Sequence, residues 1–154
     1  MEYGSIEREI HIAATPEVVY EVVSKPEHLR EWWPDEADLV PEPGATGTIT
    51  FGDPATPEGH LVPVTVIEAD PPRRFTFRWV YDADQGAAPD NSLLVTFELV
   101  PSGTGTLLRF SETGFREKGW EAAVLEEQYR DHVNGWNHFL PRLVTYVDKL
   151  VSTR

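Results

Sequence analysis

Alternating apolar and polar positions predict a chain built mainly from strands. Residues 5–13 alternate isoleucines with charged side chains, which is typical of a strand with one polar face. Five later segments are rich in β-branched and aromatic residues and are separated by turn residues: 47–51, 60–69, 74–81, 91–100 and 106–115. Five successive strands favour an antiparallel meander. Pro63 cannot donate to a strand ladder, so it indicates an edge position or a bulge.

Helical periodicity appears after the first strand and again at the end of the chain. Thr15 suits an N-cap before a helix that starts at Pro16, and residues 26–33 predict a second short helix that Pro34 ends. Residues 121–151 carry a sustained 3.6-residue pattern. We therefore expect an α+β fold in which one long helix, bent near Pro141, packs across a curved antiparallel sheet.

Aromatic side chains gather at two places where a flat core packs them poorly. Trp32 and Trp33 lie three and four residues after Leu29, so all three share one helix face. The strand at 74–81 places four aromatic residues on one face: Phe75, Phe77, Trp79 and Tyr81. Two interpretations stay open, plain core packing and the wall of a cavity between a curved sheet and a helix.

Charge and composition exclude several classes of partner. The chain has 13 basic and 26 acidic residues, a net charge of −13, which disfavours nucleic acids and anionic membranes. It has no cysteine, no apolar signal segment and no apolar run of about 20 residues. A cytoplasmic protein without membrane insertion is expected. The acidic cluster within residues 31–42 serves either solubility or docking of a protein partner.

Few residues carry recognisable chemistry. The histidines form no metal-binding motif, and neither a glycine-rich phosphate loop nor a serine-nucleophile motif is present, so we expect no metal and no cofactor. Alternation along residues 106–115 turns Glu112 inward, where it would either make a structural hydrogen bond or contact a ligand. His132 shares a helix face with Trp136 and is either a satisfied, partly buried side chain or a ligand contact.

Several local motifs together resemble one protein family. They are TPEVVY at 15–20, LREWWP at 29–34, DPPRRF at 70–75 leading to Trp79, ETGF at 112–115, and Gly135-Trp136 followed by Leu140 and Leu143. In this order they resemble the activator of heat-shock-protein-90 ATPase homologues, within the START-like (SRPBCC) helix-grip superfamily. The resemblance runs over roughly residues 5–151. It implies a single START-like domain, residues 1–154, with a curved sheet wrapped around the long helix and a cavity between them.

The resemblance leaves three functions open, because the superfamily includes lipid carriers, hormone receptors and polyketide cyclases. The favoured one is a binding protein for a small hydrophobic or aromatic ligand. Its expected ligand-binding residues are Trp32, Trp33, Phe77, Trp79, Glu112, Tyr129, His132 and Trp136. The second is a cyclase, dehydratase or hydrolase in which Glu112 and His132 act as general acid and base. The third is a stress-related co-chaperone-like module. It is less favoured because the sequence shows no extra N-terminal domain.

Overall fold

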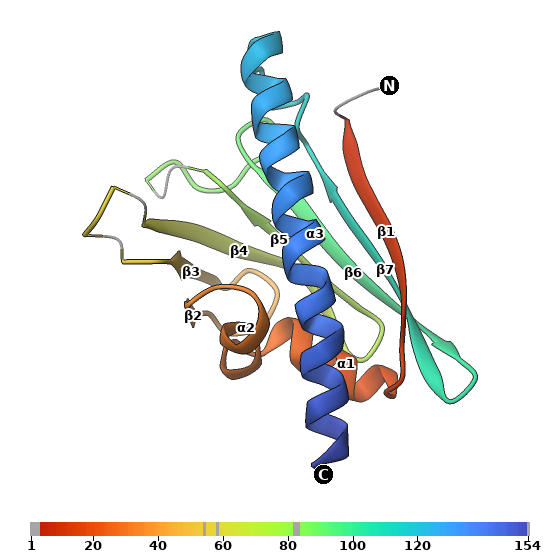
Figure 1. Cartoon of the computed structure of the whole chain (residues 1–154). Helices are drawn as coiled ribbons and strands as arrows, with labels where there is room; N and C mark the ends of the chain where they lie inside the picture. Colours follow the sequence, from red (N-terminus) through yellow and green to blue (C-terminus); the bar gives the residue numbers. More distant parts are fainter. Residues whose placement is uncertain (1–3, 54, 58, 82–83, 154) are drawn as a thin grey trace.

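The computed structural model describes residues 4–53, 55–57, 59–81 and 84–153. One seven-stranded sheet curves around a long helix, α3, which lies along its concave face (Figure 1). The elements in chain order are β1 (Ser5–Ile12), α1 (Pro16–Ser24), α2 (Pro26–Trp32), β2 (Glu36–Asp38), β3 (Thr46–Phe51), β4 (His60–Asp70), β5 (Arg74–Trp79), β6 (Leu93–Ser102), β7 (Gly105–Thr113) and α3 (Ala122–Ser152). This arrangement confirms the predicted α+β, helix-grip fold.

The strand order of the sheet is β1-β7-β6-β5-β4-β3-β2, and every neighbouring pair is antiparallel. The predicted meander is therefore confirmed for β3 to β7. The first strand closes one edge by pairing with β7, with Ser5 opposite Thr113 and Ile12 opposite Thr106. The other edge is β2, a three-residue strand that the sequence analysis did not predict.

The acidic cluster near residue 35 belongs to this second edge. Glu36 and Asp38 are exposed on β2, and Asp35 accepts a hydrogen bond from the backbone N–H of Gly52 at 2.6 Å. Short edge strands that carry charge resist pairing with strands of other molecules. The fold therefore gives part of the acidic cluster a structural role in protecting the edge.

Two irregularities lie in neighbouring strands: β4 contains a proline, and β5 ends two residues earlier than expected. Pro63 pairs with Thr48 of β3, whereas pairing of β4 with β5 begins only at Val64, so Pro63 has a neighbouring strand on one side alone. This confirms the predicted edge position. On the adjacent strand, β5 stops at Trp79 rather than at residue 81, because Val80 adopts a left-handed backbone with φ of 63°.

The helices begin where their capping residues predict. The Thr15 hydroxyl accepts a 3.4 Å hydrogen bond from the N–H of Val18, and Pro16 opens α1. Helix α3 continues without a break through Pro141. It is the single long helix that was predicted, and the bend expected at Pro141 stays a prediction. No helix in the described part of the chain is long and apolar enough to span a membrane.

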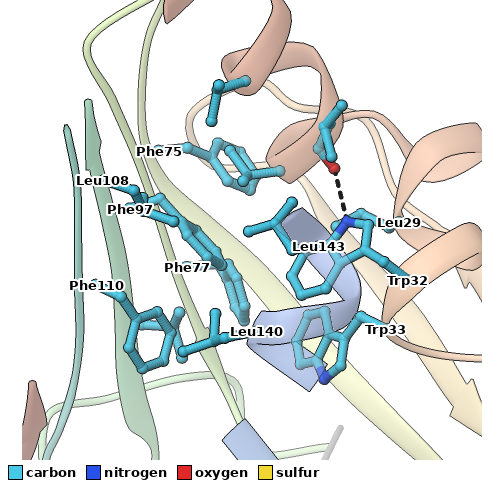
Figure 2. Packing of buried hydrophobic residues seen from close by; sticks show 14 of the residues in the cluster. Leu29, Trp32, Trp33, Phe75, Phe77, Phe97, Leu108, Phe110, Leu140 and Leu143 are labelled. Atoms are coloured by element: carbon cyan, nitrogen blue, oxygen red, sulfur yellow. Dashed lines mark hydrogen bonds between the residues drawn. The ribbon is translucent and has the colours of Figure 1, made fainter. Parts of the chain in front are cut away.

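The two short helices close one end of the core beneath α3 (Figure 1). Leu29, Trp32 and Trp33 point from α2 and its C-cap toward Leu143 of α3 and the aromatic face of the sheet (Figure 2). The Trp32 indole is fully buried, and its Nε1 donates a 3.0 Å hydrogen bond to the carbonyl of Val22. Trp32 is thereby fixed as a core residue that joins α2 to α1.

Candidate functional site

A cleft of about 850 Å³ opens between the first half of α3 and the sheet. Its walls come from α3, from the start of β4, from the end of β5 and from the two connections that follow β5 and β7. We call this hollow the α3 cleft. Its aromatic lining consists of Trp33, Phe51, Trp79, Tyr81, Trp120, Trp136 and Phe139, and His132 lies among them.

The deep wall of the α3 cleft is a set of tryptophan rings in mutual contact. The Trp33 ring centroid lies 5.1 Å from that of Trp79 and 5.1 Å from that of Trp136. Trp79 and Trp136 are themselves 6.0 Å apart. These side chains are at most 7% exposed, so each is held by the core on one side and presents only a small surface to the cleft. The wall is therefore rigid and apolar.

Trp33 reaches this wall because α2 ends one residue before it. Trp33 is the C-cap of α2, with φ of −123° and ψ of −93°, so its side chain no longer follows the helical spacing. Its ring stacks on that of Trp32 with an interplanar angle of 22°. The two adjacent tryptophans thus face different surroundings, one the core and the other the cleft.

Gly135 widens the α3 cleft from the helix side. It lies in the middle of α3 and lines the cleft, and a Cβ atom placed on it would meet nothing within 4 Å. Glycine inside a helix costs about 1 kcal/mol relative to alanine. Gly135 therefore makes α3 less stable at a position where a side chain would project into the open volume of the cleft.

The fully buried carboxylate of Glu112 binds the tryptophan wall on the side away from the cleft. Glu112 is 0% exposed, and its two oxygens accept hydrogen bonds from Trp79 Nε1 at 2.7 Å and from Trp136 Nε1 at 2.8 Å. Nδ1 of His132 lies 2.8 Å from Oε1 and 3.0 Å from Oε2 of the same carboxylate. Glu112 therefore joins β7, β5 and α3 at one point. Several such partners satisfy the hydrogen-bonding capacity of the buried carboxylate.

The rim of the α3 cleft is fixed by a lysine. Lys118 Nζ donates to the carbonyl of Val80 at 2.9 Å and to that of Asn91 at 3.0 Å, and it lies 4.9 Å from the ring centroid of Trp120. These contacts hold the left-handed backbone at Val80, which a β-branched residue adopts only under constraint. The connection after β5 is thereby tied to the segment that leads into α3.

Half of the eight predicted site residues line the α3 cleft: Trp33, Trp79, His132 and Trp136. The other four lie outside its lining: Trp32, Phe77, Glu112 and Tyr129. Phe77 is 2% exposed within the core. The Tyr129 hydroxyl donates to the carbonyl of Ser5 at 2.8 Å and so ties α3 to β1. Glu112 reaches the cleft only through the three rings that it binds.

Several cleft residues were not among the predicted ones. Phe139 follows Trp136 by three residues, so helical spacing could have found it. Phe51 and Trp120 lie at the end of a strand and in a connection, where neither periodicity places a side chain. In the described ranges, no group of three or more histidine, aspartate or glutamate side chains is close enough to hold a metal ion.

Comparison with known proteins identifies the relationships of the chain. A sequence model for activator of Hsp90 ATPase homolog 1-like proteins matches residues 13–148. No protein with a curated description matches the sequence.

Solved structures of similar fold come from several bacteria. Protein MLL2253 of Mesorhizobium loti is 25% identical, with a TM-score of 0.74 over 94% of this chain and 97% of its own. The Aha1 dimer of Colwellia psychrerythraea is 18% identical, with a TM-score of 0.68 over 93% of this chain and 95% of its own. DynU16, from the dynemicin biosynthetic locus, is 21% identical, with a TM-score of 0.70 over 94% of this chain but 47% of its own.

Proposed function

The chain belongs to the family of activator of Hsp90 ATPase homolog 1-like proteins, and we propose that it binds one small, largely apolar aromatic molecule in the α3 cleft. The observation that carries the proposal is the tryptophan wall. Core aromatic residues normally interlock, but here the faces of Trp33, Trp79 and Trp136 border a hollow of about 850 Å³. Ligand pockets in proteins commonly measure about 300–1,000 Å³ and combine aromatic walls with a few polar groups.

The apolar area that a guest can bury determines the affinity that we expect. A guest that buries roughly 200 Å² of apolar surface gains about 5 kcal/mol at 25 cal/mol per Å², before the cost of association. Because the rings are already fixed by the core, little additional ordering is needed on binding. A gain of about 5 kcal/mol corresponds to a dissociation constant of roughly 0.2 mM, so binding between about 0.1 and 1 mM is expected for a small ligand.

The test uses the fluorescent probe N-phenyl-1-naphthylamine, whose emission rises in apolar surroundings. Titration of the wild-type protein should give saturable binding with a dissociation constant of about 0.1–1 mM, and with quenching of tryptophan emission. Gly135→Leu should remove this binding, because a Cβ at this position meets nothing within 4 Å and the longer side chain would extend into the open volume of the cleft. Asn134→Leu is the matched control, since Asn134 is exposed on the same helix and does not line the cleft.

Two results would contradict the proposal. One is a probe signal that rises linearly without saturation, and the other is equal binding by wild type and Gly135→Leu. Either result would shift the interpretation toward the family's third predicted role, an interaction surface for a protein partner. The circular-dichroism spectra of both variants show whether the fold is retained.

Catalysis is a second candidate function, favoured by the 2.8 Å contact between Glu112 and His132. Because Glu112 is fully buried, a general-acid role for it would lack contact with a substrate, and His132 would act alone as the base. Deuterium exchange at the acidic C–H groups of phenylacetone, followed by NMR, tests this. Exchange that wild type accelerates and His132→Phe does not would support an enzyme. Equal exchange in both would leave binding as the function.

A further inference from the structure

The hydrogen bonds around Glu112 determine which ring nitrogen of His132 carries a proton. An indole N–H can only donate, so both carboxylate oxygens of Glu112 must act as acceptors toward Trp79 and Trp136. His132 Nδ1 faces the same two oxygens at 2.8 and 3.0 Å. A lone pair at Nδ1 would oppose the carboxylate, so Nδ1 is the protonated nitrogen. In the neutral ring, Nε2 is then an acceptor.

Packing fixes the orientation of this acceptor. The His132 ring makes edge contacts with Trp79 and with Phe115, each at a centroid distance of 5.4 Å. The side chain is 14% exposed and lines the α3 cleft, whereas the carboxylate behind it is fully buried. With Nδ1 turned toward the buried side, Nε2 is the nitrogen left for the cleft. In the described structure it has no protein partner, because every hydrogen bond of this ring is made by Nδ1.

Two of the three indole N–H groups of the deep wall, those of Trp79 and Trp136, already have hydrogen-bond partners. The N–H groups of Trp79 and Trp136 point away from the cleft, toward Glu112. A guest lying on these rings therefore meets one acceptor, Nε2 of His132, and no indole donor from these two residues. A molecule without a donor would leave Nε2 desolvated and unpaired, which is unfavourable.

We infer that the α3 cleft selects an aromatic compound that carries a hydroxyl group, and that this hydroxyl donates a hydrogen bond to Nε2 of His132. The inference rests on the proposed binding function and specifies its ligand class. Glu112 acts as a positioning residue, because it holds the imidazole in the accepting tautomer, as a carboxylate does for histidines at other sites.

The experiment compares 2-naphthol with 2-methoxynaphthalene at about pH 8. The methyl ether is the more hydrophobic compound, so burial alone would favour it. One additional hydrogen bond should instead make 2-naphthol bind about 3- to 10-fold more tightly to the wild type. His132→Phe keeps an aromatic ring and should lose this preference. His138→Phe, an exposed change on the same helix, should keep it.

A second measurement does not depend on any variant. The ¹⁵N chemical shifts of the histidine ring distinguish a protonated nitrogen from an unprotonated one, so they report the tautomer of His132 directly. Protonation at Nδ1, together with the preference for 2-naphthol, supports the inference. Protonation at Nε2, alone or together with Nδ1, or equal binding of the two compounds by the wild type, overturns it while leaving the binding function intact. Absence of saturable binding by both compounds would instead reject the binding function itself.

Discussion

Replacing Glu112 by glutamine tests how far one carboxylate holds the site together. The change keeps the shape of the side chain but replaces one acceptor oxygen by an NH₂ group. Trp79 Nε1 and Trp136 Nε1 approach different oxygens of Glu112, at 2.7 and 2.8 Å. Whichever way the amide turns, one buried indole N–H must face another donor.

The magnitude follows from what is lost at that indole. A hydrogen bond to a charged group contributes about 1.5–3 kcal/mol, and a buried donor left unpaired costs about 1–3 kcal/mol. Burying a neutral amide instead of a carboxylate recovers part of this. We expect Glu112→Gln to lower the free energy of unfolding by about 2–3 kcal/mol. Such a loss leaves most domains folded but clearly less stable.

The assay is urea unfolding followed by circular dichroism, with Glu127→Gln as the matched control. Glu127 is exposed on α3, so its replacement should change stability by less than about 0.5 kcal/mol. Double-mutant cycles with Trp79→Phe and Trp136→Phe supply the decisive comparison. In at least one cycle the double variant should be more stable than the sum of the single effects, because the opposed donor has been removed. Additive effects in both cycles, or a loss below about 0.5 kcal/mol for Glu112→Gln, would refute the reasoning.

Three further changes test the fold and the cleft. Pro141→Ala should raise the free energy of unfolding by about 1–2 kcal/mol in urea denaturation, because it restores a hydrogen bond inside α3 at an exposed position. Burial, and then the charges of Asp70 and Glu68, raise the pKa of Tyr20 to about 12. Since this lies above the unfolded value of about 10, stability present below pH 10 is lost between about pH 10 and 12, and Tyr20→Phe should lose less there. Gly135→Ala should stabilise α3 by about 0.5–1 kcal/mol in thermal unfolding while weakening probe binding.

The sequence predicted the sheet well because its signals are local. Strands β3 to β7 each have a hydrophobic pattern and turn residues at their ends, so their positions could be read directly. The missed strand, β2, is three residues long and contains two acids, so it has no pattern to recognise. Its position depends on pairing with β3. The early end of β5 was missed because a valine gives no sign of a left-handed backbone.

The site was predicted only in part, because periodicity gives the face of an element and not its neighbours. Alternation correctly turned Glu112 inward, but its partners come from β5 and α3, far away in the chain. Trp32 and Trp33 could not be separated by helical spacing. Their different surroundings follow from the exact end of α2, which depends on how the chain leaves the helix at the C-cap.

The tryptophan wall serves the core and the cleft at once, and this explains why the N–H groups of Trp79 and Trp136 are turned toward Glu112. Trp136 packs on Phe110 with a centroid distance of 4.5 Å, so moving it to suit a ligand would disturb the sheet. Directing its N–H to Glu112 satisfies the indole without using water, which leaves an apolar ring face toward the cleft. The price is a buried charge, and that charge in turn orients His132. The proposed apolar recognition by the rings and the proposed hydrogen bond to Nε2 of His132 therefore depend on the same carboxylate.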